Sequence, residues 1–203
     1  SLRAFVFPGQ GSQSVGMGKV IAEASREARA VFEEVDEALG LNLFRLMCEG
    51  PQEALNLTEN AQPAIMAHSI ALLRASALDL KDVAFCAAGH SLGEYSALCA
   101  SGAIDLSTTA RLLRLRGRAM QAAVPVGEGA MAALLGASLE IAQQVASAAA
   151  AGETCVVAND NDPGQVVLSG HRSAIDRAVE VAKEKGARRA VILPVSAPFH
   201  SPL

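Results

Sequence analysis

The sequence predicts an α/β protein made of two parts, and three observations support that fold class. Over the first 125 residues, short apolar runs typical of buried strands are separated by longer stretches with helical periodicity. Between about residues 126 and 193, strand and helix patterns follow the order β-α-β-β-α-β. The chain of 203 residues is 51% hydrophobic and 19% charged, which indicates a globular protein with one large core or two small ones.

The first part is expected to contain a parallel sheet covered by helices, because strands that alternate with helices are joined by crossover connections. It opens with a strand at residues 3–7 and the loop PGQGS at 8–12. The other expected elements are helical stretches at about 15–39, 42–48 and 61–78, a short buried strand at 83–88, and helices at 91–101 and about 106–122.

The second part follows the loop VPVGEG at 124–129. Its expected strands lie at 130–135, 154–158, 165–169 and 188–193, and its helices at 138–150 and 172–185. This order is that of a ferredoxin-like unit. We therefore expect a first domain at 1–125, a ferredoxin-like subdomain at 126–193, and a return to the first domain at 194–203.

Composition and charge exclude several classes of function. The net charge of −4 argues against a nucleic-acid-binding protein, which normally presents a basic face. The four cysteines lack the spacing of a metal site, and buried free thiols indicate the reducing cytoplasm. No run of about 20 apolar residues is present to cross a membrane. We therefore expect a soluble, cytoplasmic protein without a metal site.

A serine stands between two glycines where the expected strand gives way to a helix, in the sequence GHSLG at 89–93. Flanking glycines let the chain turn sharply, so that the Ser91 hydroxyl points outward and the next N–H faces whatever binds there. Such a turn can present a nucleophile. The alternative is structural, because serine is a favoured N-cap residue and the glycines would then only form a tight turn.

Arginine is frequent between residues 111 and 118. At about 100° per residue, Arg111, Arg114 and Arg118 share one side of the expected helix, as on a solvated face. Arg116 falls roughly 140° from Arg111, in the middle of the apolar face. A guanidinium there requires a partner. That partner is either a carboxylate of the protein or the carboxylate of a substrate, which the planar fork of arginine binds with two hydrogen bonds.

Three segments together resemble the malonyl-CoA:acyl carrier protein transacylases. They are FPGQGSQ at 7–13, GHSLGEY at 89–95 and VSAPFH at 195–200, supported by QPA at 62–64 and LRG at 115–117. The resemblance covers all 203 residues. It implies a large α/β-hydrolase-like domain with an inserted ferredoxin-like subdomain, in a cytoplasmic monomer that uses malonyl-CoA and acyl carrier protein in fatty acid synthesis and needs no metal or organic cofactor.

The resemblance also implies the catalytic roles. Ser91 corresponds to the nucleophile, and His200 corresponds to its general base and later general acid. The backbone N–H groups of Gln10 and Leu92 correspond to the oxyanion hole. Arg116 corresponds to the residue that holds the free carboxylate of the malonyl group.

Three further residues are expected to line the substrate pocket on the same basis. His90 is next to the nucleophile, and Gln62 belongs to the QPA segment. Phe199, directly before the histidine, favours malonyl over the branched methylmalonyl group in related polyketide acyltransferases.

One departure from the family pattern concerns the C-terminus. The chain ends three residues after His200, whereas groups that orient this histidine in the family come well after it. We therefore expect the C-terminal part of the large domain to be absent from this chain.

Two other functions stay open at this point. A serine thioesterase or lipase-like hydrolase would share Ser91 but give Arg116 no task. A truncated, non-catalytic chain would bind acyl carrier protein or coenzyme A without turnover.

Overall fold

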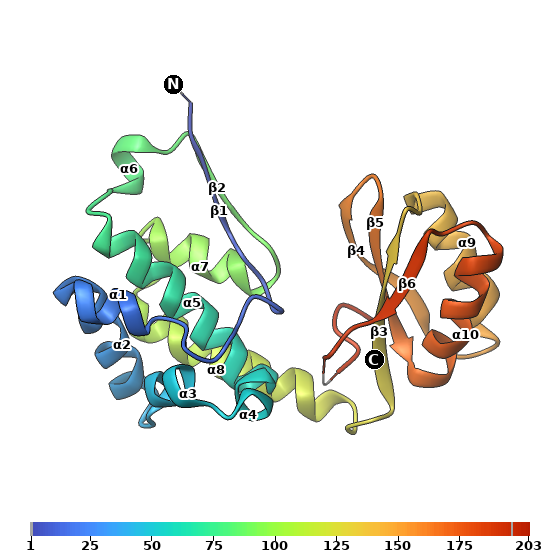
Figure 1. Cartoon of the computed structure of the whole chain (residues 1–203), viewed down its shortest axis with the longest axis horizontal. Helices are drawn as coiled ribbons and strands as arrows, with labels where there is room; N and C mark the ends of the chain where they lie inside the picture. Colours follow the sequence, from blue (N-terminus) through green and yellow to red (C-terminus); the bar gives the residue numbers. More distant parts are fainter. Residues whose placement is uncertain (1, 196) are drawn as a thin grey trace. The chain divides into compact units, whose positions relative to one another are not determined.

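The computed structural model describes residues 2–195 and 197–203, so Ser1 and Ser196, the second residue of the VSAPFH segment, lie outside it. The chain divides into two compact units, residues 1–118 and 119–203 (Figure 1). Among the helices of the described residues, none is long and apolar enough to cross a membrane.

The first unit is mainly helical, with one small parallel sheet. Strand β1 (Ala4–Phe7) pairs with β2 (Cys86–Gly89), and Phe7 lies opposite Gly89. The helices are α1 (Lys19–Ala24), α2 (Arg26–Leu39), α3 (Leu43–Glu49), α4 (Gln52–Asn56), α5 (Thr58–Ala75), α6 (Leu80–Val83), α7 (Leu92–Ala100) and α8 (Leu106–Ala123), whose last turn enters the second unit. The parallel pairing that the sequence predicts is therefore present.

Two expected elements of the first unit differ in the structure. The helix expected at 15–39 is two helices, because Ser25 adopts an extended conformation and its side chain caps α2 by accepting from Ala28 N. The strand expected at 83–88 begins at Cys86, because Asp79 caps the short helix α6 by accepting from Lys81 N. Cys86 and the two alanines after it are exposed, so the expectation of a buried strand and a buried thiol was wrong here.

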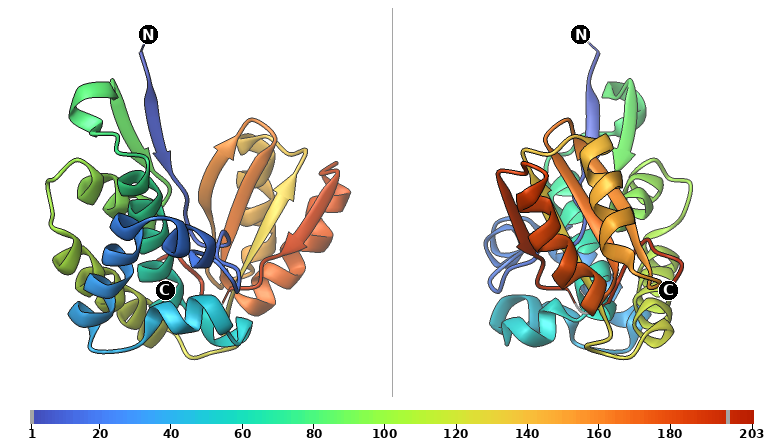
Figure 2. Two further views of the ribbon diagram at one scale, coloured as in Figure 1. Left: turned by 60° about the vertical axis from the view of Figure 1, so that its left-hand side comes forward. Right: turned by 90° about the vertical axis from the view of Figure 1, so that its right-hand side faces the viewer.

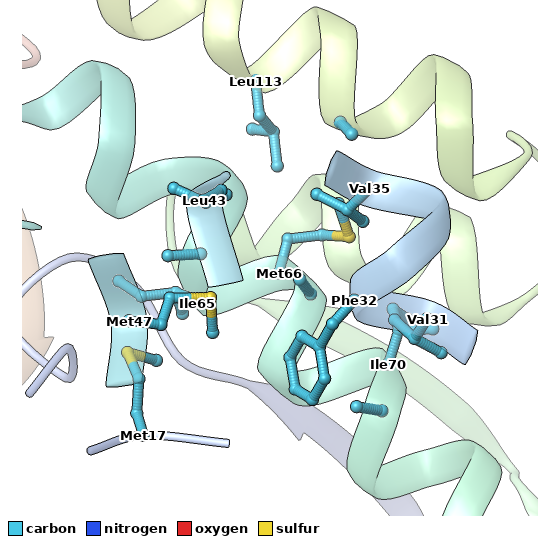
Figure 3. Close-up of a cluster of buried hydrophobic side chains, with 14 of the residues drawn as sticks. Met17, Val31, Phe32, Val35, Leu43, Met47, Ile65, Met66, Ile70 and Leu113 are labelled. Atoms are coloured by element: carbon cyan, nitrogen blue, oxygen red, sulfur yellow. The ribbon is translucent and has the colours of Figure 1, made fainter. Parts of the chain in front are cut away.

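The core of the first unit forms where α2 packs against α5 (Figure 3). The buried residues of α2 recur at helical spacing, Ala28, Val31, Phe32 and Val35, so one stripe of the helix faces the core. It meets buried side chains of α3, α5 and α8, which are Leu43, Met47, Ile65, Met66, Ile70 and Leu113. This packing fixes α5 and α8, and both helices supply residues of the candidate site.

The second unit contains an antiparallel sheet of four strands in the order β4-β5-β3-β6. Along the chain its elements are β3 (Gly129–Leu135), α9 (Leu139–Ala150), β4 (Cys155–Asp162), β5 (Gln165–His171), α10 (Arg172–Glu184) and β6 (Arg189–Ile192). The expected element order and approximate positions are therefore present. Figure 2 shows α9 and α10 side by side on one face of this sheet.

The two faces of this sheet bury different groups. Alternate residues of β3, Ala130, Ala132 and Leu134, pack with α9 and α10. On the other face, Met131 and Ala133 pack with Phe199 and other residues near the end of the chain. Gly129 allows this return, because a Cβ at that position would lie 2.3 Å from Cδ of Pro198. The sheet therefore holds the segment that ends in His200.

Close backbone approach fixes the turn between β2 and α7 in the first unit. A Cβ on Gly93 would lie 2.3 Å from the carbonyl oxygen of Phe7, and one on Gly89 would lie 1.9 Å from the carbonyl carbon of Gly93. A Cβ on Gly9 would lie 2.6 Å from the carbonyl oxygen of His90. These three glycines therefore let the loop after β1 lie directly against the turn that contains Ser91.

The N-terminus of α5 is fastened to α8 by a second close approach. Gly117 lies so near Glu59 that a Cβ would be 2.5 Å from the Glu59 Cα. The Glu59 carboxylate accepts from Arg114 at 3.1 Å and from Arg118 at 3.0 Å, and Arg114 also bonds Asn60. The Arg114 side chain is only 16% exposed, so the expectation that it lies on a solvated face was wrong.

We expect Gly93→Ala to destabilise the protein by about 3 kcal/mol or more, because the added methyl has no space beside the Phe7 carbonyl. Denaturant unfolding would measure this loss. Gly164→Ala is the matched control, since a Cβ there makes only ordinary contact with Asp162 at 3.6 Å. Equal effects of both substitutions would contradict the close approach.

We expect Glu59→Gln to lower the free energy of unfolding by about 1–2 kcal/mol, because it leaves the largely buried Arg114 without its carboxylate. Glu49→Gln removes the exposed ion pair with Arg45 and should change stability little. Thermal or denaturant unfolding of the two variants tests the difference. A Glu59 variant as stable as the Glu49 variant would mean that the ion pairs of Glu59 with Arg114 and Arg118 contribute nothing to the free energy of unfolding.

Candidate active site

Ser91 occupies a strained turn between β2 and α7. Its backbone angles are φ 53° and ψ −109°, a sparsely populated combination for a residue with a side chain, which costs about 1–3 kcal/mol. The serine is the N-cap of α7, but its side chain makes no capping hydrogen bond. The turn is held instead by main-chain bonds, in which His90 N donates to Phe7 O and Gly93 N donates to His90 O. The structural alternative of a capping serine therefore does not describe this side chain.

The Arg116 guanidinium lies beside the serine hydroxyl. Its Nη2 is 3.0 Å from Ser91 Oγ, and its Nη1 donates to Gln62 Oε1 at 2.6 Å. The ring centroid of Tyr95 is 5.5 Å from the guanidinium carbon, within cation–π range. The guanidinium of Arg116, a residue of α8, therefore reaches the strained turn at Ser91.

The environment of Arg116 differs in one respect from the sequence expectation. The buried stripe of α8 consists of Leu106, Thr109, Ala110, Leu113 and Gly117. Half-buried Arg116 flanks this stripe and does not lie in its middle, because the helix buries residue 113 and residue 117 against α5. The side chain can therefore reach past the core to the end of α7.

Burial lowers the pKa of Arg116, while nearby Tyr95 and Glu94 act in the opposite direction. An arginine stays charged at neutral pH even so. Among the ion pairs of the described residues, none involves Arg116. Of the two partners that the sequence leaves open, a carboxylate of the protein is therefore not found in this part of the chain.

Gln62 connects Arg116 to the loop after β1. The Gln62 side chain is 1% exposed, and its Nε2 donates to Thr58 Oγ1 at 2.8 Å. Thr58, also 1% exposed, donates from Oγ1 to Gln10 Oε1 at 2.9 Å. Sequence reasoning missed Thr58, although its position four residues before Gln62 places both on one face of α5.

The two expected oxyanion donors belong to adjacent segments. Gln10 lies in the turn after β1, which packs against the Ser91 turn through Gly9. Leu92 is the first residue of α7, where a backbone N–H has no acceptor within its own helix. His90 is exposed on the same turn. The first unit thus brings together Ser91 and the other expected site residues Gln10, Gln62, His90, Leu92 and Arg116.

Phe199 and His200 belong to the second unit. Phe199 is buried against Met131 and Val167 of the sheet, whereas His200 is exposed and has a positive φ of 55°. A mainly apolar pocket of about 310 Å³ lies beside them, lined by residues of the end of α8 and of the C-terminal segment, including Met120 and Leu203. The buried phenylalanine therefore anchors the histidine that follows it.

Within residues 2–195 and 197–203, no group of three or more His, Cys, Asp and Glu side chains is placed to hold a metal ion.

Comparison with known sequences identifies relatives along nearly the whole chain. The acyl transferase domain family matches residues 4–203. The malonyl CoA-acyl carrier protein transacylase of Bacillus subtilis (strain 168) is 49% identical over 98% of this chain and 63% of its own length. The enzyme of that name from Escherichia coli (strain K12) is 46% identical over 98% of this chain and 65% of its own length. The chain thus spans less than two thirds of these relatives.

Solved structures give the same result. The crystal structure of acyl-carrier-protein-S-malonyltransferase from Bartonella henselae is 54% identical, with a TM-score of 0.93 over 98% of this chain and 65% of that one. A malonyl-transacylase solved with a type II PKS acyl-carrier protein is 42% identical, with a TM-score of 0.91 over 98% of this chain and 64% of that one. The mixed α/β fold, with one parallel and one antiparallel sheet, is therefore shared with these proteins. The chain belongs to the acyl transferase domain family.

Proposed function

We propose that this protein transfers a malonyl group from malonyl-CoA to the phosphopantetheine thiol of an acyl carrier protein, through an ester on Ser91. One observation carries the proposal: the Arg116 guanidinium lies 3.0 Å from the Ser91 hydroxyl without a carboxylate of the described protein paired to it. A cation at that position suits an acyl group that has a free carboxylate at its far end. Relatives named for malonyl transfer support the same substrate.

In the first half-reaction, Ser91 Oγ attacks the thioester carbonyl carbon while its proton passes to His200. A serine hydroxyl is a weak nucleophile, and an imidazole can take the proton near neutral pH. The negative charge that develops on the carbonyl oxygen is stabilised by the N–H groups of Leu92 and Gln10, each worth about 3 kcal/mol. The C–S bond then breaks, and coenzyme A leaves with the proton from His200.

In the second half-reaction, the carrier thiol attacks the carbonyl carbon of the seryl ester. His200 takes the thiol proton and returns it to Ser91 Oγ as the C–O bond breaks, which regenerates the free enzyme. The strained backbone at Ser91 suits both half-reactions, because such a turn makes the hydroxyl project toward the acyl group. The acyl-carrier-protein complex of a 42% identical relative supports the choice of acceptor.

Selectivity follows from Arg116. An acyl group without a carboxylate would leave the guanidinium desolvated and without an anion, so acetyl-CoA should be a poor substrate. Phe199 would limit the room beside the malonyl α-carbon and disfavour a methyl branch. His90 and Gln62 would line the same pocket.

The finer architecture is also proposed. We infer an α/β-hydrolase-like domain at 1–125 and 194–203 with a ferredoxin-like subdomain at 126–193, which the strand order β4-β5-β3-β6 supports. The division of the chain near residue 118 supports a boundary in this region. Fatty acid synthesis in the cytoplasm, by a monomer without a bound cofactor, is the setting that the sequence resemblance predicts.

After brief mixing with malonyl-CoA, intact-mass measurement should find one malonyl group on the protein. Ser91→Ala should abolish this adduct, because it removes the attacking oxygen. Ser101→Ala, at the other end of α7, is the matched control and should keep it. An adduct on the Ser91 variant would contradict the assignment, and steady release of free malonate without a carrier would favour a hydrolase.

Arg116→Ala should slow loading from malonyl-CoA by about 100-fold or more, because the carboxylate loses two charge-assisted hydrogen bonds. Loading from acetyl-CoA should not fall. Arg116→Lys keeps the charge but not the planar fork, so an intermediate rate is expected. Single-turnover loading rates for both acyl-CoAs measure the effect, and equal losses for the two would rule out Arg116 as the carboxylate ligand.

A further inference from the structure

The Arg116 guanidinium makes two kinds of contact within the first unit. Its Nη1 and Nη2 donate to Gln62 Oε1 and Ser91 Oγ, and its carbon lies over the Tyr95 ring, 5.5 Å from the ring centroid. The first kind of contact uses N–H groups at the edge of the guanidinium. The second is an attraction between the cation and the ring, and it uses none of these N–H groups. The contact with Tyr95 therefore does not compete with a ligand for hydrogen bonds.

Helical spacing places the Tyr95 ring beside the Ser91 turn. Tyr95 comes four residues after Ser91, the N-cap of α7, and helical side chains lean toward the N-terminus of their helix. The ring is half-buried and packs against the hydrophobic core of the first unit. The core therefore fixes the position of the ring, and the Arg116 guanidinium lies against a rigid side chain.

An aromatic ring holds a cation without neutralising it. The face of the ring carries partial negative charge and attracts the guanidinium, but the pair keeps its net positive charge. A carboxylate of the protein would bind the guanidinium more strongly and would compete with a substrate carboxylate. Among the ion pairs of the described residues, none joins Arg116 to a carboxylate, and nearby Glu94 is exposed. Tyr95 therefore stabilises the half-buried cation and leaves it able to bind an anion.

We propose that Tyr95 is a positioning residue for acyl-group selection, because its ring holds the Arg116 guanidinium beside Ser91 and leaves the N–H groups for the carboxylate of the acyl group. This inference rests on the proposed function and adds a second residue to the choice of substrates that carry a carboxylate. The role belongs to the face of the ring, which a phenylalanine also has. In the proposed mechanism, Tyr95 touches no reacting atom.

The contact with the ring matters most when the acyl group is attached to Ser91. The acyl carboxylate then accepts Arg116 N–H groups that now point to Ser91 and Gln62. The contact with the ring can persist through this exchange, because it uses no N–H group. Tyr95→Leu would keep an apolar side chain against the core but remove the ring face. Only acyl groups that need Arg116 would then load more slowly.

The test compares single-turnover loading of the full chain from malonyl-CoA and from acetyl-CoA, measured by intact mass. Tyr95→Leu should slow malonyl loading about fivefold or more, because a partly desolvated cation–π contact is lost. Acetyl loading should stay within about twofold of the unmodified protein, since an acetyl group has no carboxylate for Arg116 to bind. Tyr95→Phe keeps the ring and should keep the malonyl rate within about twofold.

Phe44→Leu is the matched control. Phe44 is also a half-buried ring packed against the core of the first unit, but it stacks on Phe32, with 4.3 Å between the ring centroids. This variant should lower the free energy of unfolding, as Tyr95→Leu should, and leave the malonyl-to-acetyl ratio unchanged. In an Arg116→Ala background, Tyr95→Leu should no longer change the ratio, because the group that the ring positions is gone.

The outcomes separate this inference from the proposed function. If Tyr95→Leu keeps the unmodified ratio, or slows malonyl and acetyl loading equally, Tyr95 has only a structural role and the inference is overturned. If Tyr95→Phe lowers the ratio as much as Tyr95→Leu, the hydroxyl acts instead of the ring, which also overturns it. If Tyr95→Leu does not fold, Tyr95→Met replaces it with the same expectation. If the unmodified protein itself forms no malonyl adduct, the proposed function fails, and this inference fails with it.

Discussion

The close approach of two backbone segments determines the geometry on which the candidate site depends. The loop after β1 lies against the turn between β2 and α7, and Gly9, Gly89 and Gly93 leave no room there for a Cβ. This contact places Gln10 next to the turn that presents Ser91. It also holds Ser91 in a backbone conformation that residues other than glycine rarely adopt. The parallel pairing of β1 with β2 leads both segments to the same end of the sheet.

The arginines of helix α8 make two different sets of contacts. Arg114 and Arg118 fasten α8 to the start of α5 through Glu59, and Gly117 lets the two backbones meet. Arg116 points instead to Gln62 and Ser91. The ion pairs of Glu59 thus hold α8, which carries Arg116, against the start of α5, which carries Thr58 and Gln62.

Local patterns predict much of this arrangement, because glycine positions, apolar periodicity and strand-helix alternation depend on nearby residues. They locate the Ser91 turn, single out Arg116 as an arginine that requires a partner, and predict the element order of the second unit. They miss what long-range packing decides. Periodicity places Arg114 on the polar side of its helix. In the structure its side chain is largely buried and paired with Glu59, which lies 55 residues earlier in the chain. The only sequence signal for the hydrogen bond between Thr58 and Gln62 is their separation of four residues on one helix. The break between α1 and α2 depends on one N-cap residue, Ser25.

In the proposed mechanism, Arg116 binds the carboxylate of an acyl group attached to Ser91. A crystal structure of the protein after brief exposure to malonyl-CoA would show whether it does. We expect continuous density from Ser91 Oγ into a malonyl ester whose carboxylate accepts two hydrogen bonds from the Arg116 guanidinium. A malonyl group bound to another atom, or a carboxylate that lies in solvent while Arg116 keeps its bonds to Ser91 and Gln62, would contradict this role of Arg116.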